Sequence, residues 1–215
     1  MVVKILDENP SILTGFLNEI RDKSIQNDRL RYRRNIERIG EVMAYEVSQS
    51  LHYEQSQTET ILGIKQTHQL QDEVVICSIL RAGLALHQGI LNYFDMSDSG
   101  FISANRVNTD AGIKVDLAYK SLPHMDNKTL LLVDPMLATG ISMLESIKKL
   151  QKINQPKQIH ILVVVAAPEG VQHLQNHLDD SIHLWVASMD DGLNEKSYII
   201  PGLGDAGDLA YGTKF

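Results

Sequence analysis

The segment that decides the fold reads LLLVDPMLATGIS over residues 130–142, and MLESIKKL follows it over residues 143–150. Four consecutive apolar residues are typical of a short strand that is buried on both faces. The second stretch has apolar residues at helical spacing, and small residues join the two. The segment therefore predicts a buried strand that ends at Asp134, a tight loop, and a helix from about Ser142 to Ile153.

The loop between this strand and this helix has the composition of a phosphate-binding site. Backbone N–H groups and the hydroxyls of Thr139 and Ser142 would lie at the helix N-terminus, where the helix dipole favours an anion. Gly140 allows a positive φ or a close approach of the backbone to a ligand. Asp134 would then accept hydrogen bonds from a ribose diol beside the phosphate. The alternative is that Thr139 and Ser142 only cap the helix.

Strands and helices alternate along most of the chain. Apolar runs predict strands at residues 61–65, 74–80, 101–107, 130–133, 159–166 and 182–187, with helices at 82–93, 142–153 and 169–178. This alternation predicts an α/β fold, a parallel sheet flanked by helices on both sides. Residues 112–120 alternate between apolar and polar side chains, which indicates a half-exposed strand or arm. Ligands of such sheets bind beyond the carboxyl ends of the strands.

The first sixty residues predict helices. Asn9 and Pro10 are a plausible cap and first turn of one helix, and a second is expected from about Asp28 to Leu51. The basic opening of the second helix, residues 29–34, is typical of a solvated face or an interface, and a nucleic-acid role is less favoured.

Composition narrows the class of protein. The net charge of −7 argues against a general nucleic-acid binder. The single cysteine, Cys77, cannot form an internal disulfide, and the longest apolar run, residues 161–168, is far too short to span a membrane. We therefore expect a cytoplasmic protein that has no membrane association.

The loop after residue 133 resembles a known motif. Asp134 at a strand end, with Thr139, Gly140 and Ser142 five to eight residues later, is similar to the PRPP-binding motif of type I phosphoribosyltransferases (PRPP is 5-phosphoribosyl 1-diphosphate). VDPMLATG is the form seen in uracil phosphoribosyltransferases, although those usually carry glycine at the position of Ile141. Purine-specific relatives commonly carry an aspartate where this chain has Ala138. The resemblance implies that PRPP contacts Asp134, Pro135, Met136, Leu137, Ala138, Thr139, Gly140, Ile141 and Ser142.

The C-terminal segment YIIPGLGDAGD, residues 198–208, resembles the uracil loop of the same family. Uracil presents an acceptor, a donor and a second acceptor along one edge, which main-chain groups can match without charged side chains. The resemblance implies that Ile199, Gly204, Asp205 and Ala206 contact uracil and that Asp205 also faces PRPP and its magnesium. Residues 209–211 depart from the family, which carries a basic residue and an Ile-Phe pair there.

Two arginines complete the expected PRPP site. Arg81 lies in ILRAGL, residues 79–84, which resembles the pyrophosphate loop of the family, and guanidinium groups bind phosphates through paired N–H donors. Arg106 matches a second PRPP arginine, although its usual acidic neighbours are absent from the sequence. The resemblance also implies a strained or cis peptide near Leu80–Arg81.

The resemblance as a whole implies one phosphoribosyltransferase domain over residues 1–215. Its expected parts are N-terminal helices at about 9–56, a PRPP-binding core at about 60–190 and the uracil loop at 198–208, with the terminal segments forming a hood or arm. The implied reaction converts uracil and PRPP to UMP and diphosphate in pyrimidine salvage. Asp134, Arg81 and Asp205 would be the catalytic residues, and Mg²⁺ would arrive with PRPP rather than in a protein-only cage.

Partners and alternatives remain open at this stage. Relatives suggest a homodimer or larger homo-oligomer, and GTP is a candidate activator to which no residue can be assigned. One alternative is a pyrimidine-responsive RNA-binding regulator, which the acidic charge and the intact uracil loop disfavour. The others are a catalytically degenerate nucleotide-binding paralogue and a phosphoribosyltransferase for purines or orotate.

Overall fold

The computed structural model describes residues 1–109 and 112–214, with side chains described for 1–103 and 119–214. A central sheet has the strand order β1-β10-β9-β7-β4-β5-β6, and the short β8 pairs with β9. All neighbouring pairs are parallel except β5 and β6. The strands are β1 (Val2–Ile5), β4 (Val74–Leu80), β5 (Asp98–Thr109), β6 (Gly112–Ser121), β7 (Thr129–Val133), β8 (Met136–Leu137), β9 (Gln158–Ala166) and β10 (Ile182–Met189).

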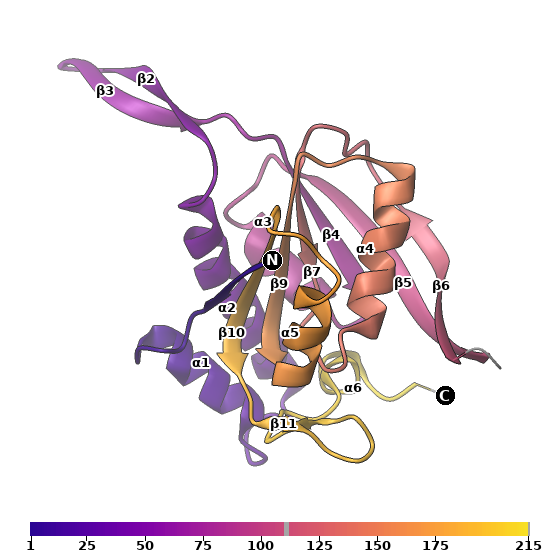
Figure 1. Ribbon diagram of the computed structural model, residues 1–215. Helices are drawn as coiled ribbons and strands as arrows, with labels where there is room; N and C mark the ends of the chain where they lie inside the picture. The colour runs from indigo at the N-terminus through magenta and orange to yellow at the C-terminus, as the bar shows by residue number, and fades with distance from the viewer. Residues whose placement is uncertain (110–111, 215) are drawn as a thin grey trace.

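Helices cover both faces of this sheet, as Figure 1 shows. On one face lie α1 (Ile12–Arg21), α2 (Arg29–Ser48) and α3 (Leu84–Leu91), and on the other lie α4 (Ile141–Ile153) and α5 (Pro168–Gln175). The α/β architecture expected from the alternating pattern is therefore confirmed. The predicted central strands β4, β7 and β9 are almost completely buried, because two helical layers enclose them.

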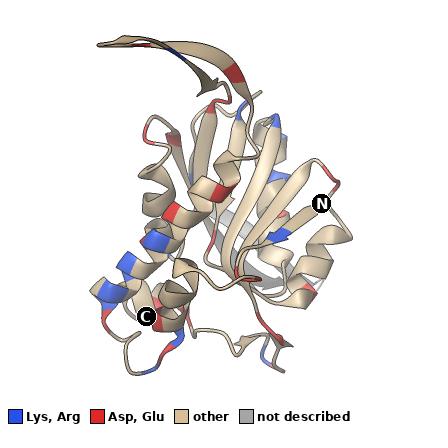
Figure 2. Ribbon diagram, turned by 90° about the vertical axis from the view of Figure 1, so that its left-hand side faces the viewer, with Lys and Arg blue, Asp and Glu red and all other residues tan. Residues whose placement is uncertain are grey.

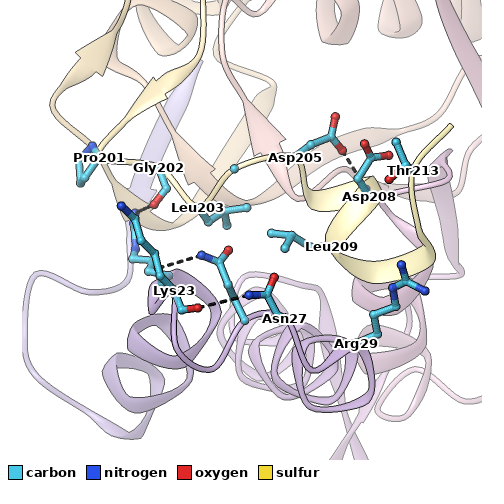
Figure 3. A pocket seen from close by; sticks show the side chains of 13 residues that line it. Lys23, Asn27, Arg29, Pro201, Gly202, Leu203, Asp205, Asp208, Leu209 and Thr213 are labelled. Atoms are coloured by element: carbon cyan, nitrogen blue, oxygen red, sulfur yellow. Dashed lines mark hydrogen bonds between the residues drawn. The ribbon is translucent and has the colours of Figure 1, made fainter.

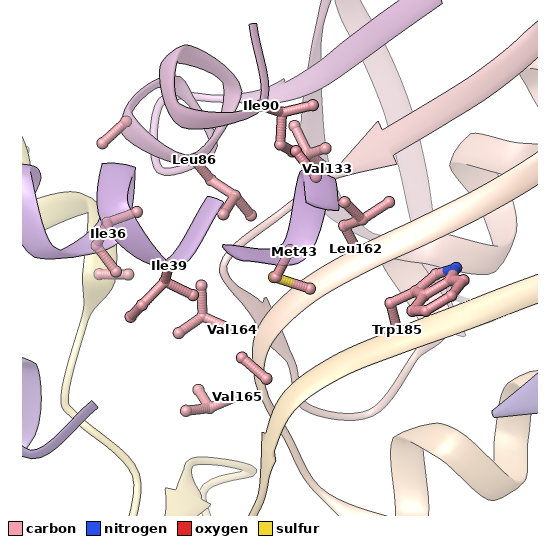
Figure 4. Packing of buried hydrophobic residues seen from close by; sticks show 14 of the residues in the cluster. Ile36, Ile39, Met43, Leu86, Ile90, Val133, Leu162, Val164, Val165 and Trp185 are labelled. Atoms are coloured by element: carbon pink, nitrogen blue, oxygen red, sulfur yellow. The ribbon is translucent and has the colours of Figure 1, made fainter. Parts of the chain in front are cut away.

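The larger core cluster lies between the sheet and the N-terminal helices. Ile39 and Met43 of α2 point toward Val164 and Leu162 of β9, while Trp185 of β10 closes one side (Figure 4). All five of these side chains are at most 1% exposed. Burying such side chains contributes about 1.5–3 kcal/mol each, which fixes the N-terminal helices on the sheet.

Two glycines bring α2 and α3 into backbone contact. A Cβ atom at Gly40 would lie 2.7 Å from the carbonyl oxygen of Leu86, and one at Gly89 would overlap the carbonyl oxygen of Glu37. Side chains at either position would force the helices apart. The pair therefore packs more closely than ridges and grooves of side chains allow.

The N-terminal predictions need correction. The chain is not helical to residue 56, and the strand predicted at 61–65 is part of a longer hairpin of β2 (Tyr53–Thr60) and β3 (Gly63–Leu70) that projects from the body (Figure 1). Seven of the eight residues of β2 are exposed, so neither face needs the apolar alternation by which strands are recognised. The edge strand β1 was also missed. Helix α1 begins after Ser11, which caps it in place of Asn9.

The strand prediction near residue 112 is confirmed. The strand expected at 112–120 is β6, although most of its side chains lie outside the described part. Among the described helices, none combines the length and the hydropathy needed to cross a bilayer.

Candidate active site

A cavity of about 800 Å³ lies beyond the carboxyl ends of β4 and β7. It brings together three segments that the sequence singled out, the loop after β4, the loop after β7 and the C-terminal segment. The predicted site residues that line it are Arg81, Asp134, Met136, Ala138, Ser142, Ile199, Gly204, Asp205 and Ala206. Lys196, Ser197, Tyr198 and Lys214 also line it, and the sequence had assigned them no role.

The loop after β7 has the backbone expected of an anion cradle. Gly140 is the N-cap of α4, with φ 76° and ψ −13°, and makes no side-chain cap. The alternative that Thr139 and Ser142 serve as caps is therefore wrong, since neither occupies the N-cap position. Asp134 turns toward this loop and accepts a hydrogen bond at 3.5 Å from the backbone N–H of Met136.

Helix α5 supports the back of this loop. A Cβ atom at Gly140 would lie 2.8 Å from the carbonyl oxygen of Gly170, and one at Gly170 would overlap the carbonyl oxygen of Ala138. The loop and the first turn of α5 thus meet backbone to backbone. This contact fixes the backbone of the loop next to the cavity.

The loop after β4 carries the expected arginine. The Leu80–Arg81 peptide is cis, which confirms the prediction made for it. The Arg81 guanidinium donates through Nη2 to the carbonyl oxygen of Gly212 at 2.9 Å and to Asp208 Oδ1 at 3.3 Å. The expected diphosphate loop and the C-terminal segment are therefore in direct contact.

A buried histidine connects β4, which precedes the Arg81 loop, to the neighbouring strand β5. His87 of α3 lies between two hydroxyls, with Nδ1 2.8 Å from Ser78 Oγ and Nε2 2.9 Å from Ser99 Oγ. The ring also stacks on Phe101. Burial lowers the pKa of His87 to about 4, so the ring is neutral at pH 7 and links β4, α3 and β5.

An ion pair that the sequence did not indicate holds the C-terminal loop. Arg21 of α1 donates to both carboxylate oxygens of Asp190, at 2.6 and 2.9 Å, and to the carbonyl oxygen of Gly202 at 3.0 Å. Asp190 also accepts from the N–H of Gly202 at 2.9 Å. Because 169 positions separate Arg21 from Asp190, no local pattern could have paired them. The loop follows the hairpin of β11 (Gly192–Leu193) and β12 (Ile199–Ile200) and leads into α6 (Ala206–Tyr211).

Some predicted PRPP residues do not line the cavity. Leu137 is 1% exposed and packs in the second core cluster, and Pro135 is buried. Thr139 and Gly140 in the loop and Ile141 at the start of α4 are also outside the lining. Arg106 lies on β5, and its side chain is outside the described residues.

A second cavity, of about 510 Å³, lies on the other side of the C-terminal loop. Lys23, Asn27 and Arg29 face Leu203 and Asp205 across it (Figure 3). Gly204, Asp205 and Leu203 belong to one short loop, so this loop separates the two cavities.

The basic start of α2 lies beside the C-terminus, where Figure 2 shows the blue bands of this helix. Arg31 pairs with Glu19, Arg34 with Glu37, and Arg33 donates to the carbonyl oxygen of Ala210 at 2.7 Å. These contacts favour the interface interpretation over an RNA-binding patch. Elsewhere in the described residues, no three His, Cys, Asp or Glu side chains converge to hold a metal ion.

Comparison with known proteins places this geometry in a family. A family model described as uracil phosphoribosyltransferase matches residues 8–213. The chain is 46% identical to the uracil phosphoribosyltransferase of Porphyromonas gingivalis over the full length of both chains. It is 34% identical to that of Thermococcus gammatolerans, over 96% of this chain and 92% of the relative. The solved structure of the AQ2163 protein from Aquifex aeolicus superposes with a TM-score of 0.84 at 28% identity, covering 97% of this chain and 98% of that one. The chain belongs to the uracil phosphoribosyltransferase family.

Proposed function

We propose that this protein transfers the phosphoribosyl group of PRPP to uracil and releases UMP and diphosphate. One observation carries the proposal: a single cavity is lined by Asp134 after β7, Arg81 after β4, and Ile199, Gly204 and Ala206 of the C-terminal loop. These groups suit, in that order, the hydroxyls of a ribose, a diphosphate and an uncharged base. The full-length relationship to enzymes with this name supports the same assignment.

The mechanism follows from how these groups are placed. A displacement at the anomeric carbon of ribose passes through a transition state with oxocarbenium character, and negative charge grows on the departing diphosphate. Arg81 stabilises that charge, while the loop that begins at Asp134 holds the phosphate and ribose. Backbone groups between Ile199 and Ala206 orient the base so that its ring nitrogen faces the anomeric carbon. Ala138 lines the cavity without an ionisable group, which suits uracil.

Magnesium fits this site as a companion of PRPP. The carboxylates of Asp134 and Asp205 line the cavity and offer the oxygen ligands that Mg²⁺ prefers, and waters and phosphate oxygens would supply the remainder. When bound, the ion would neutralise part of the diphosphate charge. Chelation with EDTA is expected to abolish turnover, and added Mg²⁺ is expected to restore it.

The activity test combines purified protein, PRPP and Mg²⁺ with uracil, cytosine, hypoxanthine or orotate, with and without GTP. UMP from uracil alone is the expected result. Asp134→Asn should reduce kcat/KM for PRPP at least tenfold, because it removes a charge-assisted acceptor at the ribose. Asp191→Asn is the matched control, since Asp191 is exposed and lines neither cavity.

Failure would separate the alternatives. PRPP binding without product from any base would indicate a degenerate paralogue. Tight, strongly salt-dependent RNA binding without product would indicate a regulator. The GTP arms decide whether that nucleotide activates the enzyme.

We also propose that the protein is a homo-oligomer built through the β2–β3 hairpin. A two-stranded hairpin is marginally stable alone in water. At its tip Ile61 and Leu62 are almost fully exposed and Ile64 is 68% exposed, so a second copy of the chain would bury apolar surface there. Replacing Ile61 and Leu62 by serine should lower the mass measured by light scattering. An unchanged mass would refute this use of the hairpin.

The buried free thiol of Cys77 agrees with a cytoplasmic location, which we propose on that ground.

A further inference from the structure

The contact between Arg81 and the C-terminal segment has a consequence for substrate binding. Both hydrogens of Nη2 are engaged, one by the carbonyl oxygen of Gly212 and one by the carboxylate of Asp208. Two-point binding of a phosphate by a guanidinium uses either Nη1 with Nη2 or Nε with Nη2. Since Nη2 belongs to both pairs, a diphosphate must compete with Asp208 and Gly212 for it.

The Nε–H group of Arg81 is a second donor that a diphosphate could engage. Among the described residues, Nε of Arg81 is buried and has no hydrogen-bond partner. A buried N–H without an acceptor destabilises the arrangement. An anion that displaced Asp208 and accepted from both Nε and Nη2 would satisfy this donor.

Helix α6 lies directly against the Arg81 loop. A Cβ atom at Gly207 would lie 3.9 Å from Cβ of Ala82 and 4.0 Å from Nη2 of Arg81. One turn of this helix holds both Asp205 and Asp208, because the N–H of Asp208 donates to Asp205 Oδ1 at 2.9 Å (Figure 3). The diphosphate loop and the expected uracil loop therefore share one cluster of polar contacts.

We propose that Asp208 is a positioning residue that competes with diphosphate for Arg81 and so links the diphosphate site to the C-terminal loop. The proposal rests on the proposed function, because it takes Arg81 as the diphosphate ligand. Asp208 holds the guanidinium against α6, and diphosphate displaces it. By linkage, whatever stabilises the Arg81–Asp208 pair weakens diphosphate binding by the same factor.

The test measures binding of inorganic pyrophosphate in the presence of Mg²⁺ by titration calorimetry. Asp208→Asn keeps the size of the side chain but removes the charge that competes for Arg81. We expect its Kd to fall about two- to fivefold, the range set by ion pairs that are about one-third exposed. Asp208→Ser, a second neutral variant, should bind similarly, and Asp208→Glu should stay near wild type. Asp191→Asn is the control for loss of one exposed negative charge.

The outcomes distinguish this inference from the site assignment. Arg81→Ala should weaken pyrophosphate binding at least tenfold. If it does not, Arg81 is not the diphosphate ligand, and the competition with Asp208 is refuted as well. If Arg81→Ala weakens binding while both neutral Asp208 variants bind equally or less tightly than wild type, the site stands and the competition is refuted. A purely structural role for Asp208 would weaken binding, whereas competition predicts tighter binding in a folded variant, checked by its thermal midpoint.

Discussion

Replacing Gly140 by alanine tests whether the backbone of the loop after β7 binds the 5′-phosphate. Gly140 has φ 76°, where a residue with a Cβ atom costs about 1–2 kcal/mol. The added Cβ would also lie 2.8 Å from the carbonyl oxygen of Gly170. Ordinary contact begins at 3.4 Å, so α5 or the loop must move by roughly 0.6 Å. Together, strain of about 1–2 kcal/mol and overpacking of about 1–3 kcal/mol should lower the free energy of unfolding by about 2–5 kcal/mol.

The same shift should impair catalysis more than folding. A misplacement of about 1 Å can cost 100-fold in rate, so roughly half that distance should lower kcat/KM for PRPP by about tenfold. The KM for uracil should change little, because the nearest neighbours of a Cβ atom at Gly140 belong to α5 and not to the C-terminal loop. Steady-state kinetics would be measured below the thermal midpoint of the variant, and urea unfolding would give its stability.

Gly15→Ala supplies the control for this experiment. Gly15 lies in helix α1, and a Cβ atom there would have no neighbour within 4 Å. Alanine at this position should raise the free energy of unfolding by about 0.5–1 kcal/mol and leave the kinetics unchanged. A folded Gly140→Ala protein with wild-type kcat/KM for PRPP would refute the assignment of this loop to phosphate binding.

Two further perturbations test the supports of the site. Arg21→Ala leaves the carboxylate of Asp190, which is 3% exposed, without its cation, so the free energy of unfolding measured in urea should fall by about 3 kcal/mol. The KM for uracil should also rise, because the carbonyl group of Gly202 loses its hydrogen bond to Arg21. An unchanged KM would show that the ion pair serves folding alone. Burial lowers the pKa of both His87 and His160 to about 4, below the usual 6.5, so the unfolded chain takes up protons first as the pH falls. The stabilisation is complete above pH 6.5 and is lost down to about pH 4, with a loss of about 2 kcal/mol per histidine at pH 5. His87→Gln should flatten this dependence of urea stability on pH, and an equally steep curve would contradict the assignment.

The parts of the fold that the sequence predicted are those with a strong local signal. The buried strands β4, β7 and β9 are continuous apolar runs because both faces are covered, and Gly140, at which a positive φ or a close backbone approach was expected, has a positive φ. Only a strand at residues 61–65 was predicted within the hairpin from Tyr53 to Leu70, because most of its residues are exposed and the sequence there has no apolar period.

In the site, too, residues in local motifs were predicted and long-range contacts were not. The types of residue that bind phosphate and base could be named, since each lies in a short motif with its own chemistry. Their partners could not be named, because Arg81 meets Asp208 across 127 positions and Arg21 meets Asp190 across 169. Such pairs arise from how the helices stack on the sheet, which no local pattern records.

The longest helix connects two distant parts of the molecule. At 20 residues, α2 is about 30 Å long, and its first turns contact the C-terminal segment through Arg33 while its far end leads into the projecting hairpin (Figure 1). Between these ends, the backbones of α2 and α3 are in contact at Gly40 and Gly89. One continuous helix therefore spans the distance from the outermost part of the molecule to Ala210 in α6, which follows the C-terminal loop that lines the candidate site.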